Sequence, residues 1–260
     1  MNIPFYQVDA FTDKVFGGNP AAVCLLDRWP EDNIMQAIAA ENNLSETAFL
    51  VGGGADYDLR WFTPALEIDL CGHATLASAY VIFNFLEPKL TAVRFQTASG
   101  ELRVGREGDL LVMDFPTRRA KQTGVVTGLA DALGAEPEEV YGARDILAVF
   151  ATETLVRTLA PDFAALEKIK DAFAVIVTAP GDTVDFVSRF FAPKAGIPED
   201  PVTGSAHCTL VPYWSARLGK QKLHALQVSA RGGELFCADK GERVSMAGRA
   251  VLYAQGELAL

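Results

Sequence analysis

The sequence predicts an α+β fold of two similar lobes, each a mostly antiparallel, barrel-like sheet wrapped around a central buried helix. The first observation behind this prediction is that residues 74–83 and 201–216 contain no Lys, Arg, Asp or Glu. A helix on a protein surface would carry charges on one side, so each run is expected to be enclosed by protein. Both runs are shorter than the about 20 residues that cross a bilayer.

The second observation is an internal repeat. Gly72 and Gly204 lie 132 positions apart, and each lies where a polar turn leads into one of the uncharged runs. Residues 56–64 match residues 185–193 at an offset of 129, and a third match farther along the chain keeps nearly the same spacing. Three matches in one order favour a duplicated unit. We therefore expect two similar lobes that face each other.

The first lobe, residues 1–117, is predicted to consist mainly of strands, because apolar and polar residues alternate over short stretches. These stretches are residues 5–11, 21–26, 44–51, 57–62, 93–97, 101–106 and 110–115. Residues 31–42 are predicted to be a helix, because Ile34, Met35 and Ile38 recur with helical spacing. Three consecutive glycines at 52–54 lead into another strand, which predicts a hairpin turn rather than a phosphate loop.

The second lobe is predicted over residues 118–250, and the last strand, about residues 251–260, is expected to return to the first lobe. Surface helices are predicted at 127–133 and 161–172. Strands are predicted at 148–152, 154–158, 174–178, 184–190, 227–229, 234–238, 243–246 and 250–258. Pro212 lies inside the second uncharged run and is expected to kink its helix.

Composition argues against several classes of function. The formal net charge of −10 makes general binding to nucleic acid or to anionic membranes unexpected, because both need basic clusters. The first residues lack the basic start and apolar segment of a signal peptide. Four scattered cysteines indicate free thiols in a reducing cytoplasm. Three histidines without a Cys-x-x-Cys or His-Glu-x-x-His pattern predict no metal site.

The two helix starts, at Gly72 and Gly204, are the candidate binding site. A helix N-terminus carries about half a positive charge and several unpaired N–H groups, so it can hold a carboxylate. With the lobes facing each other, both N-termini would point into one cleft, flanked by His73, Asp200 and Ser205. A small carboxylated molecule is the expected ligand. The alternative is that the two glycines only permit tight packing.

One carboxylate has no counterpart in the repeat. At the offset of 129, Glu46 falls opposite Val175, and it lies between Leu44 and Ala48 in a predicted strand of mostly apolar residues. An inward glutamate in apolar surroundings is suited to taking and returning a proton near neutral pH. The alternative is an exposed glutamate or a surface ion pair.

Cys71 also has no cysteine at the matching position of the repeat. At the offset of 132, Cys71 falls opposite Thr203. A hydroxyl is too weakly acidic to replace a thiol in deprotonating carbon, which disfavours stereoinversion by a cysteine pair. Residues i and i+2 of a helix rarely face each other, so contact between Cys71 and His73 is not expected. A racemase or epimerase that uses Cys71 alone stays open.

Six short motifs, in order, span nearly the whole chain. They are VDAFT at 8–12, GNPAAV at 18–23, NLSETAF at 43–49, CGHAT at 71–75, DPVTGSA at 200–206 and SARGG at 229–233. Together they resemble the phenazine-biosynthesis PhzF-like family, which is related to diaminopimelate epimerase. The resemblance implies two lobes with the active site between them, isomerisation without a cofactor, and a homodimer.

The resemblance also implies roles for individual residues. In the family's phenazine branch, a glutamate carries a proton across a cyclic dihydro-hydroxyanthranilate, and that role falls on Glu46. The supporting positions fall on His73, Asp200 and Ser205, and the backbone around Gly72 and Gly204 would hold the substrate carboxylate.

Three hypotheses follow for the function. The first is a cytoplasmic, cofactor-independent isomerase of a small carboxylated metabolite, in which Glu46 moves a proton within one molecule. The second is an amino-acid racemase or epimerase that uses Cys71. The third is a protein that binds small molecules or partners without turning them over.

Overall fold

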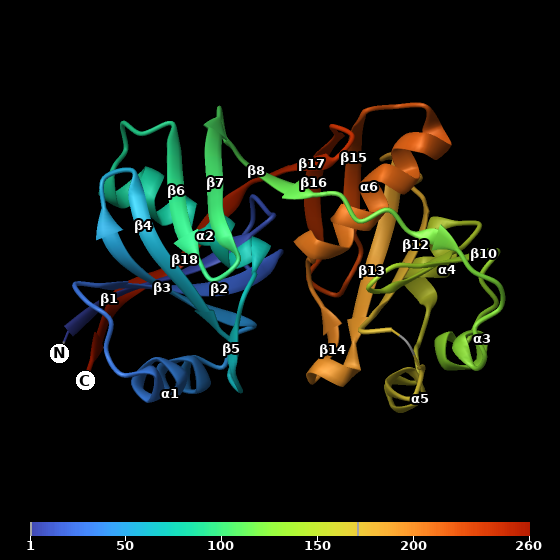
Figure 1. The fold of residues 1–260 in the computed structure, drawn as a ribbon, viewed down its shortest axis with the longest axis horizontal. Helices are drawn as coiled ribbons and strands as arrows, with labels where there is room; N and C mark the ends of the chain where they lie inside the picture. Colours follow the sequence, from blue (N-terminus) through green and yellow to red (C-terminus); the bar gives the residue numbers. More distant parts are fainter. Residues whose placement is uncertain (1, 171) are drawn as a thin grey trace. The chain divides into compact units, whose positions relative to one another are not determined.

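The structure is a computed structural model that describes residues 2–170 and 172–260. The chain forms two compact units (Figure 1). Unit 1 comprises the chain up to Asp114 together with Ala247–Leu260, and unit 2 comprises Phe115–Met246. The chain thus leaves unit 1 once and returns to it for its last strand. No helix in the described part of the chain is long and apolar enough to cross a membrane.

Unit 1 is built mainly from strands, with one helix inside and one outside the sheet. The helices are α1 (Asp32–Asn42), α2 (Gly72–Val81) and the π-helix η1 (Ile82–Leu86). The strands are β1 (Asn2–Ala10), β2 (Asn19–Leu26), β3 (Glu46–Gly53), β4 (Asp56–Phe62), β5 (Glu67–Ile68), β6 (Ala92–Thr97), β7 (Gly100–Glu107), β8 (Leu110–Pro116) and β18 (Ala250–Ala259).

The central helix of unit 1 is α2, as the uncharged run predicted. It contacts β1, β2, β3 and β18 (Figure 1), and its residues from His73 to Val81 are buried except Tyr80. Its hydroxyl groups are satisfied without water, because Thr75 Oγ1 donates to the Cys71 carbonyl at 2.6 Å and Ser78 Oγ donates to the Ala74 carbonyl at 2.8 Å. A helix buried on all sides can therefore tolerate these polar residues.

Unit 2 repeats the pattern around α6 (Gly204–Leu218), which packs beside β15 and β16 (Figure 1). Its other helices are α3 (Leu129–Leu133), α4 (Glu153–Thr158), α5 (Phe163–Glu167) and the 3-10 helix η2 (Pro193–Ala195). Its strands are β9 (Lys121–Gln122), β10 (Glu139–Gly142), β11 (Ile146–Val149), β12 (Val175–Pro180), β13 (Phe186–Ala192), β14 (Ile197–Asp200), β15 (Lys222–Gln227), β16 (Gly233–Asp239) and β17 (Arg243–Gly248).

Strand pairing shows the duplication directly. In unit 1, β2 and β3 are parallel, β3 and β4 are antiparallel, β4 and β6 are parallel, and β6 and β7 are antiparallel. In unit 2, β11 to β13, β15 and β16 repeat this sequence of parallel and antiparallel pairs. Asp56 pairs with Arg94 where β6 joins β4, and Phe186 pairs with Ala225 where β15 joins β13. The predicted α+β fold is confirmed.

Several predicted elements differ from the observed ones. Residues 154–158, predicted as a strand, lie in α4, because Thr152 caps the helix by accepting a bond from the Leu155 N–H, and Arg157 pairs with Glu153 one turn earlier. Of the helix predicted over 161–172, α5 covers Phe163–Glu167, and residue 171 lies outside the described residues. The short strands β5, β9, β10 and β14 were not predicted. Pro212 lies inside α6, and the kink expected there stays a prediction.

Candidate active site

The centre of the candidate site is a buried carboxylate beside a buried imidazole. Glu46 Oε2 lies 3.0 Å from His73 Nε2, and the two side chains are only 9% and 5% exposed. Glu46 is the first residue of β3, where β3 runs parallel to β2 with Ala21 opposite Glu46. His73 is the second residue of α2. The packing of α2 against β3 therefore places an acid and a base, 27 residues apart in sequence, in direct contact.

The other ring nitrogen of His73 has two neighbours. Cys71 Sγ lies 3.5 Å from His73 Nδ1, and Asn19 Nδ2 lies 3.2 Å from the same atom. The expectation that Cys71 and His73 do not face each other was wrong. Cys71 precedes the helix and has an extended backbone, with φ −140° and ψ 111°, so the helical i, i+2 geometry does not apply to it. Both side chains are buried.

Burial and charge act in opposite directions on this cluster. Burial opposes a charge on His73, but the negative charge that Cys71 and Glu46 can carry outweighs it and raises the pKa of His73 well above its usual value. Burial, together with the charge of Glu46, raises the pKa of the Cys71 thiol. A free thiolate at Cys71 is therefore disfavoured.

The cluster also has donor atoms of the kind that bind metals. One oxygen of Glu46, the sulfur of Cys71 and one nitrogen of His73 lie within 4.8 Å of one another, a group that the sequence pattern did not predict. In the structure, Nδ1 is the His73 nitrogen nearer to Cys71 and Nε2 is the one nearer to Glu46. Each ring nitrogen therefore already has a neighbour with which it can share a proton. The arrangement fits an acid–base pair better than a metal centre.

In unit 2, Asp200 belongs to a turn that is held together by buried and partly buried hydrogen bonds. The Thr203 hydroxyl donates to Asp200 Oδ2. Gln227, which is fully buried, accepts from the Thr203 N–H at 2.8 Å and donates to the Asp200 carbonyl at 2.8 Å. Ser229 donates to the Pro201 carbonyl at 2.8 Å. This network fixes the orientation of Asp200 at the turn that leads into α6.

Ser205, in the first turn of α6, is paired with an arginine. Arg144 Nη2 donates to Ser205 Oγ at 3.2 Å, and the same guanidinium forms a two-bond pair with Asp145 at 3.0 and 2.7 Å. Asp145 is buried, and the Arg144 guanidinium lies 4.9 Å from the centre of the Phe173 ring. Asp145 thus holds one side of the Arg144 guanidinium, and part of the positive charge of Arg144 remains near the start of α6.

The two helix starts have the features expected of anion-binding sites. Helix α2 begins at Gly72 and α6 begins at Gly204, and neither has a side-chain hydrogen bond from its capping residue. The first N–H groups of a helix have no partner within the helix, so they are donors for a ligand. The sequence therefore placed Gly72 and Gly204 correctly at helix N-termini, although their role in binding stays a prediction.

The structure groups the predicted residues by unit. Glu46 and His73 meet in unit 1, whereas Asp200 and Ser205 flank the start of α6 in unit 2. Sequence reasoning gave no role to Asn19, Arg144 or Gln227. Asn19 did lie inside the quoted motif at 18–23, so a polar residue within an otherwise apolar strand was a usable signal. Arg144 and Gln227 offered none, because each reaches the site from a distant strand or loop.

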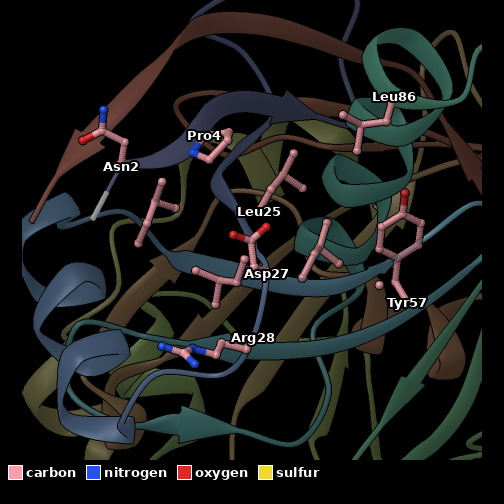
Figure 2. A pocket seen from close by; sticks show the side chains of 11 residues that line it. Asn2, Pro4, Leu25, Asp27, Arg28, Tyr57 and Leu86 are labelled. Atoms are coloured by element: carbon pink, nitrogen blue, oxygen red, sulfur yellow. The ribbon is translucent and has the colours of Figure 1, made fainter.

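A separate hollow in unit 1 does not contain the candidate site. It has a volume of about 690 Å³. Its lining includes Leu25, Asp27 and Tyr57 (Figure 2), together with Leu26 and Leu50. It lies at the Gly52 end of β3, whereas Glu46 is at the other end of that strand. The site is therefore assigned from the chemistry of its side chains and not from this cavity.

Fold and site together define a protein of the class in which two repeated α+β units each enclose a helix, with an acid–base pair at the start of the first helix. The family model described as phenazine biosynthesis-like protein matches residues 8–256. The chain belongs to this PhzF family.

Known relatives agree with this assignment over full length. An uncharacterised isomerase of Pseudomonas aeruginosa is 54% identical over 260 residues, covering 100% of both chains. A crystal structure of a PhzF-family protein from Enterococcus faecalis is 49% identical and covers 100% of both chains, with a TM-score of 0.98. A hydroxyproline epimerase of Agrobacterium vitis, 11% identical, has a TM-score of 0.62 over 100% of this chain and 93% of its own. That last likeness shows the fold alone.

Proposed function

We propose that the protein is a cofactor-independent isomerase of a small carboxylated metabolite, in which Glu46 moves a proton within the substrate. The observation that carries this proposal is the 3.0 Å contact between Glu46 Oε2 and His73 Nε2 in a buried site. General acid–base catalysis needs a group that is held in position and shielded from water, and both conditions hold for Glu46. The naming of full-length relatives as isomerases supports the reaction class.

The proposed reaction balances without a redox partner. A C–H bond of the substrate breaks, its proton forms an O–H bond with Glu46, and the electron pair shifts along an adjacent unsaturated system. The O–H bond of Glu46 then breaks, and the proton bonds to another atom of the same molecule. His73 supports the charge of Glu46, since an imidazole at 3.0 Å can pair with a carboxylate.

Binding is assigned to the helix starts. Backbone N–H groups at Gly72 and Gly204 would donate to the substrate carboxylate, because helix N-termini favour negative charge. Ser205 would hydrogen-bond the substrate, and Asp200 would orient it or relay a proton. Arg144 adds positive charge beside Ser205, so it is proposed as a further ligand for an anionic substrate.

A racemase or epimerase is the second candidate, because Cys71 lies within the acid–base cluster, 3.5 Å from His73 Nδ1. Its raised pKa argues against a thiolate at neutral pH. The expectation of a cytoplasmic homodimer stays a prediction, and sedimentation of the purified protein would measure the oligomeric state.

The deciding experiment is a metabolite screen in heavy water, read by NMR and mass spectrometry, with wild-type, Glu46→Gln and Cys71→Ser proteins. A changed position of hydrogen or unsaturation that depends on Glu46 supports the isomerase. Lost stereochemistry at one carbon that depends on Cys71 supports the epimerase. Carboxylate binding without product or deuterium exchange would instead indicate a binding protein.

A further inference from the structure

We propose that Asn19 is a positioning residue, which holds His73 in the tautomer with its proton on Nε2, the ring nitrogen 3.0 Å from Glu46 Oε2, and keeps Cys71 a neutral thiol. The proposal deepens the function proposed above, on which its catalytic meaning rests. It explains how a site that contains both the Glu46 carboxylate and the Cys71 thiol could use the carboxylate, and not the thiol, to move a proton. The argument starts from the neighbours of the imidazole ring.

The groups around the ring in the described structure come from three elements. Glu46, from β3, faces Nε2, while Asn19, from β2, and Cys71, before α2, both face Nδ1. The amide nitrogen of Asn19 is 3.2 Å from Nδ1, closer than the sulfur of Cys71 at 3.5 Å. An amide NH₂ group can only donate, so Nδ1 must accept from it and cannot carry a proton in the neutral ring.

Two consequences follow from an occupied lone pair at Nδ1. The proton of the neutral ring lies on Nε2, so Nε2 has no lone pair with which His73 could take up the proton that Glu46 has removed from the substrate. That proton stays available for return to the same molecule. In addition, Nδ1 has no free lone pair to accept the Cys71 proton, which is the transfer that would create a reactive thiolate.

Asn19 is well fixed for this role. Its side chain is fully buried, and its backbone pairs with Ala10 at the start of β2. The preceding Gly18 has φ +60°, and a Cβ there would lie 2.1 Å from the Ala10 carbonyl oxygen, so only glycine fits this turn. Pro20 follows and fixes the next φ angle. The backbone on both sides of Asn19 is thus constrained, which limits the positions that its amide can reach.

The direct test is the tautomer of His73, measured by ¹⁵N NMR on the intact, labelled protein without any substrate. The chain has three histidines, and the His73 signals are assigned by their loss in His73→Gln. His207 is an internal reference of the opposite kind, because its Nδ1 lies 2.8 Å from the Thr203 carbonyl and must carry the proton there. In the neutral ring of wild-type His73 we expect a proton on Nε2 and none on Nδ1. A neutral ring protonated on Nδ1 overturns the proposal.

Two variants separate this role from a merely structural one. Asn19→Asp has nearly the same shape, but its carboxylate can only accept, so Nδ1 of His73 should then carry a proton. Asn19→Leu removes the donor, so Nδ1 becomes free to accept from Cys71. Alkylation of Cys71 at neutral pH should then accelerate about tenfold, because Nδ1 can accept the thiol proton and the reactive thiolate becomes more populated. Addition of Cys71→Ser should abolish the increase and leave only the slow reaction of the other buried thiols.

The outcomes distinguish this proposal from the proposed function. An unchanged tautomer in Asn19→Asp, or unchanged alkylation in a natively folded Asn19→Leu, contradicts the role of Asn19. If Asn19→Leu fails to fold, the His73 tautomers measured in the wild-type protein and in Asn19→Asp decide whether Asn19 has this role. Full turnover by Glu46→Gln would reject the mechanism of isomerisation while leaving the tautomer result intact.

Discussion

Arg144 and Ser205 are joined by a hydrogen bond of 3.2 Å from the guanidinium Nη2 to the serine hydroxyl. Because Asp145 holds the guanidinium from one side with two further bonds, the arginine is pre-positioned before any ligand arrives. A charged donor beside a helix N-terminus increases the attraction for an anion beyond that of the helix alone. This arrangement leads to the first prediction.

Arg144→Leu should weaken binding of the carboxylated substrate about tenfold or more, because a hydrogen bond to a charged group contributes about 1.5–3 kcal/mol. With a substrate found by the heavy-water screen, KM should rise more than kcat falls. Arg103→Leu, at an exposed position of β7, is the matched control and should leave KM unchanged. An unaltered KM in Arg144→Leu would remove this arginine from the proposed site.

Glu46→Gln should lower kcat/KM by at least about a hundredfold, since a positioned acid–base group contributes typically 10²–10⁴. The amide has the same shape but cannot take a proton, so ligand affinity measured by calorimetry should change little. Glu41→Gln, on the exposed side of α1, is the control for loss of a carboxylate. Equal turnover by the Glu46 and Glu41 variants would contradict the mechanism.

His207 should make the protein less stable as the pH falls. Burial lowers the pKa of His207 from 6.5 to about 4. Between these pH values the imidazole is protonated in the unfolded chain but not in the folded protein. The free energy of unfolding should therefore fall between pH 6.5 and 4, by about 3 kcal/mol from this residue. His207→Asn keeps a donor for the Thr203 carbonyl and should reduce the pH slope, measured by urea unfolding at several pH values. Identical slopes for the two proteins would show that His207 does not contribute.

Arg189→Met should destabilise the protein by about 3 kcal/mol, the usual cost of breaking a buried ion pair. The Arg189 side chain is 10% exposed, binds Glu199 at 2.7 and 2.9 Å, and donates to two backbone carbonyls, those of Val156 and Leu159. All these acceptors would lose a partner. Arg94→Met, in an exposed pair with Asp56, should cost less than about 1 kcal/mol in the same denaturation experiment. Similar losses in both variants would contradict this account.

The sequence was sufficient for the fold because the fold depends on simple patterns. The absence of charge identified α2 and α6, and the repeat identified the two units. The break in that repeat singled out Glu46, which the structure places in contact with His73 and whose catalytic role stays a prediction. Asn19 and Gln227 were given no role, because their contacts depend on strand packing between segments that are far apart in sequence. Contact between Cys71 and His73 was not expected, because the rule for helical spacing does not hold for a residue just before the helix.

Helix α4 shows the limit of local patterns. Residues 154–158 alternate in a way that fits a strand, but Thr152 caps a helix there, and a few tenths of a kcal/mol from the Glu153–Arg157 pair adds to it. In such short segments, capping and tertiary packing override periodicity. The same reason accounts for α5, which ends earlier than its apolar pattern suggested.

The pairing of β1 with β18 matters for how the chain is synthesised. Asn2 pairs with Ala259, so β1 leaves the ribosome long before the strand that covers its edge. Unit 2 is a continuous segment between the two parts of unit 1 and is available earlier. Unit 1 is therefore begun before unit 2 and completed after it, and during that interval its uncovered strand edge is open to pairing with other chains.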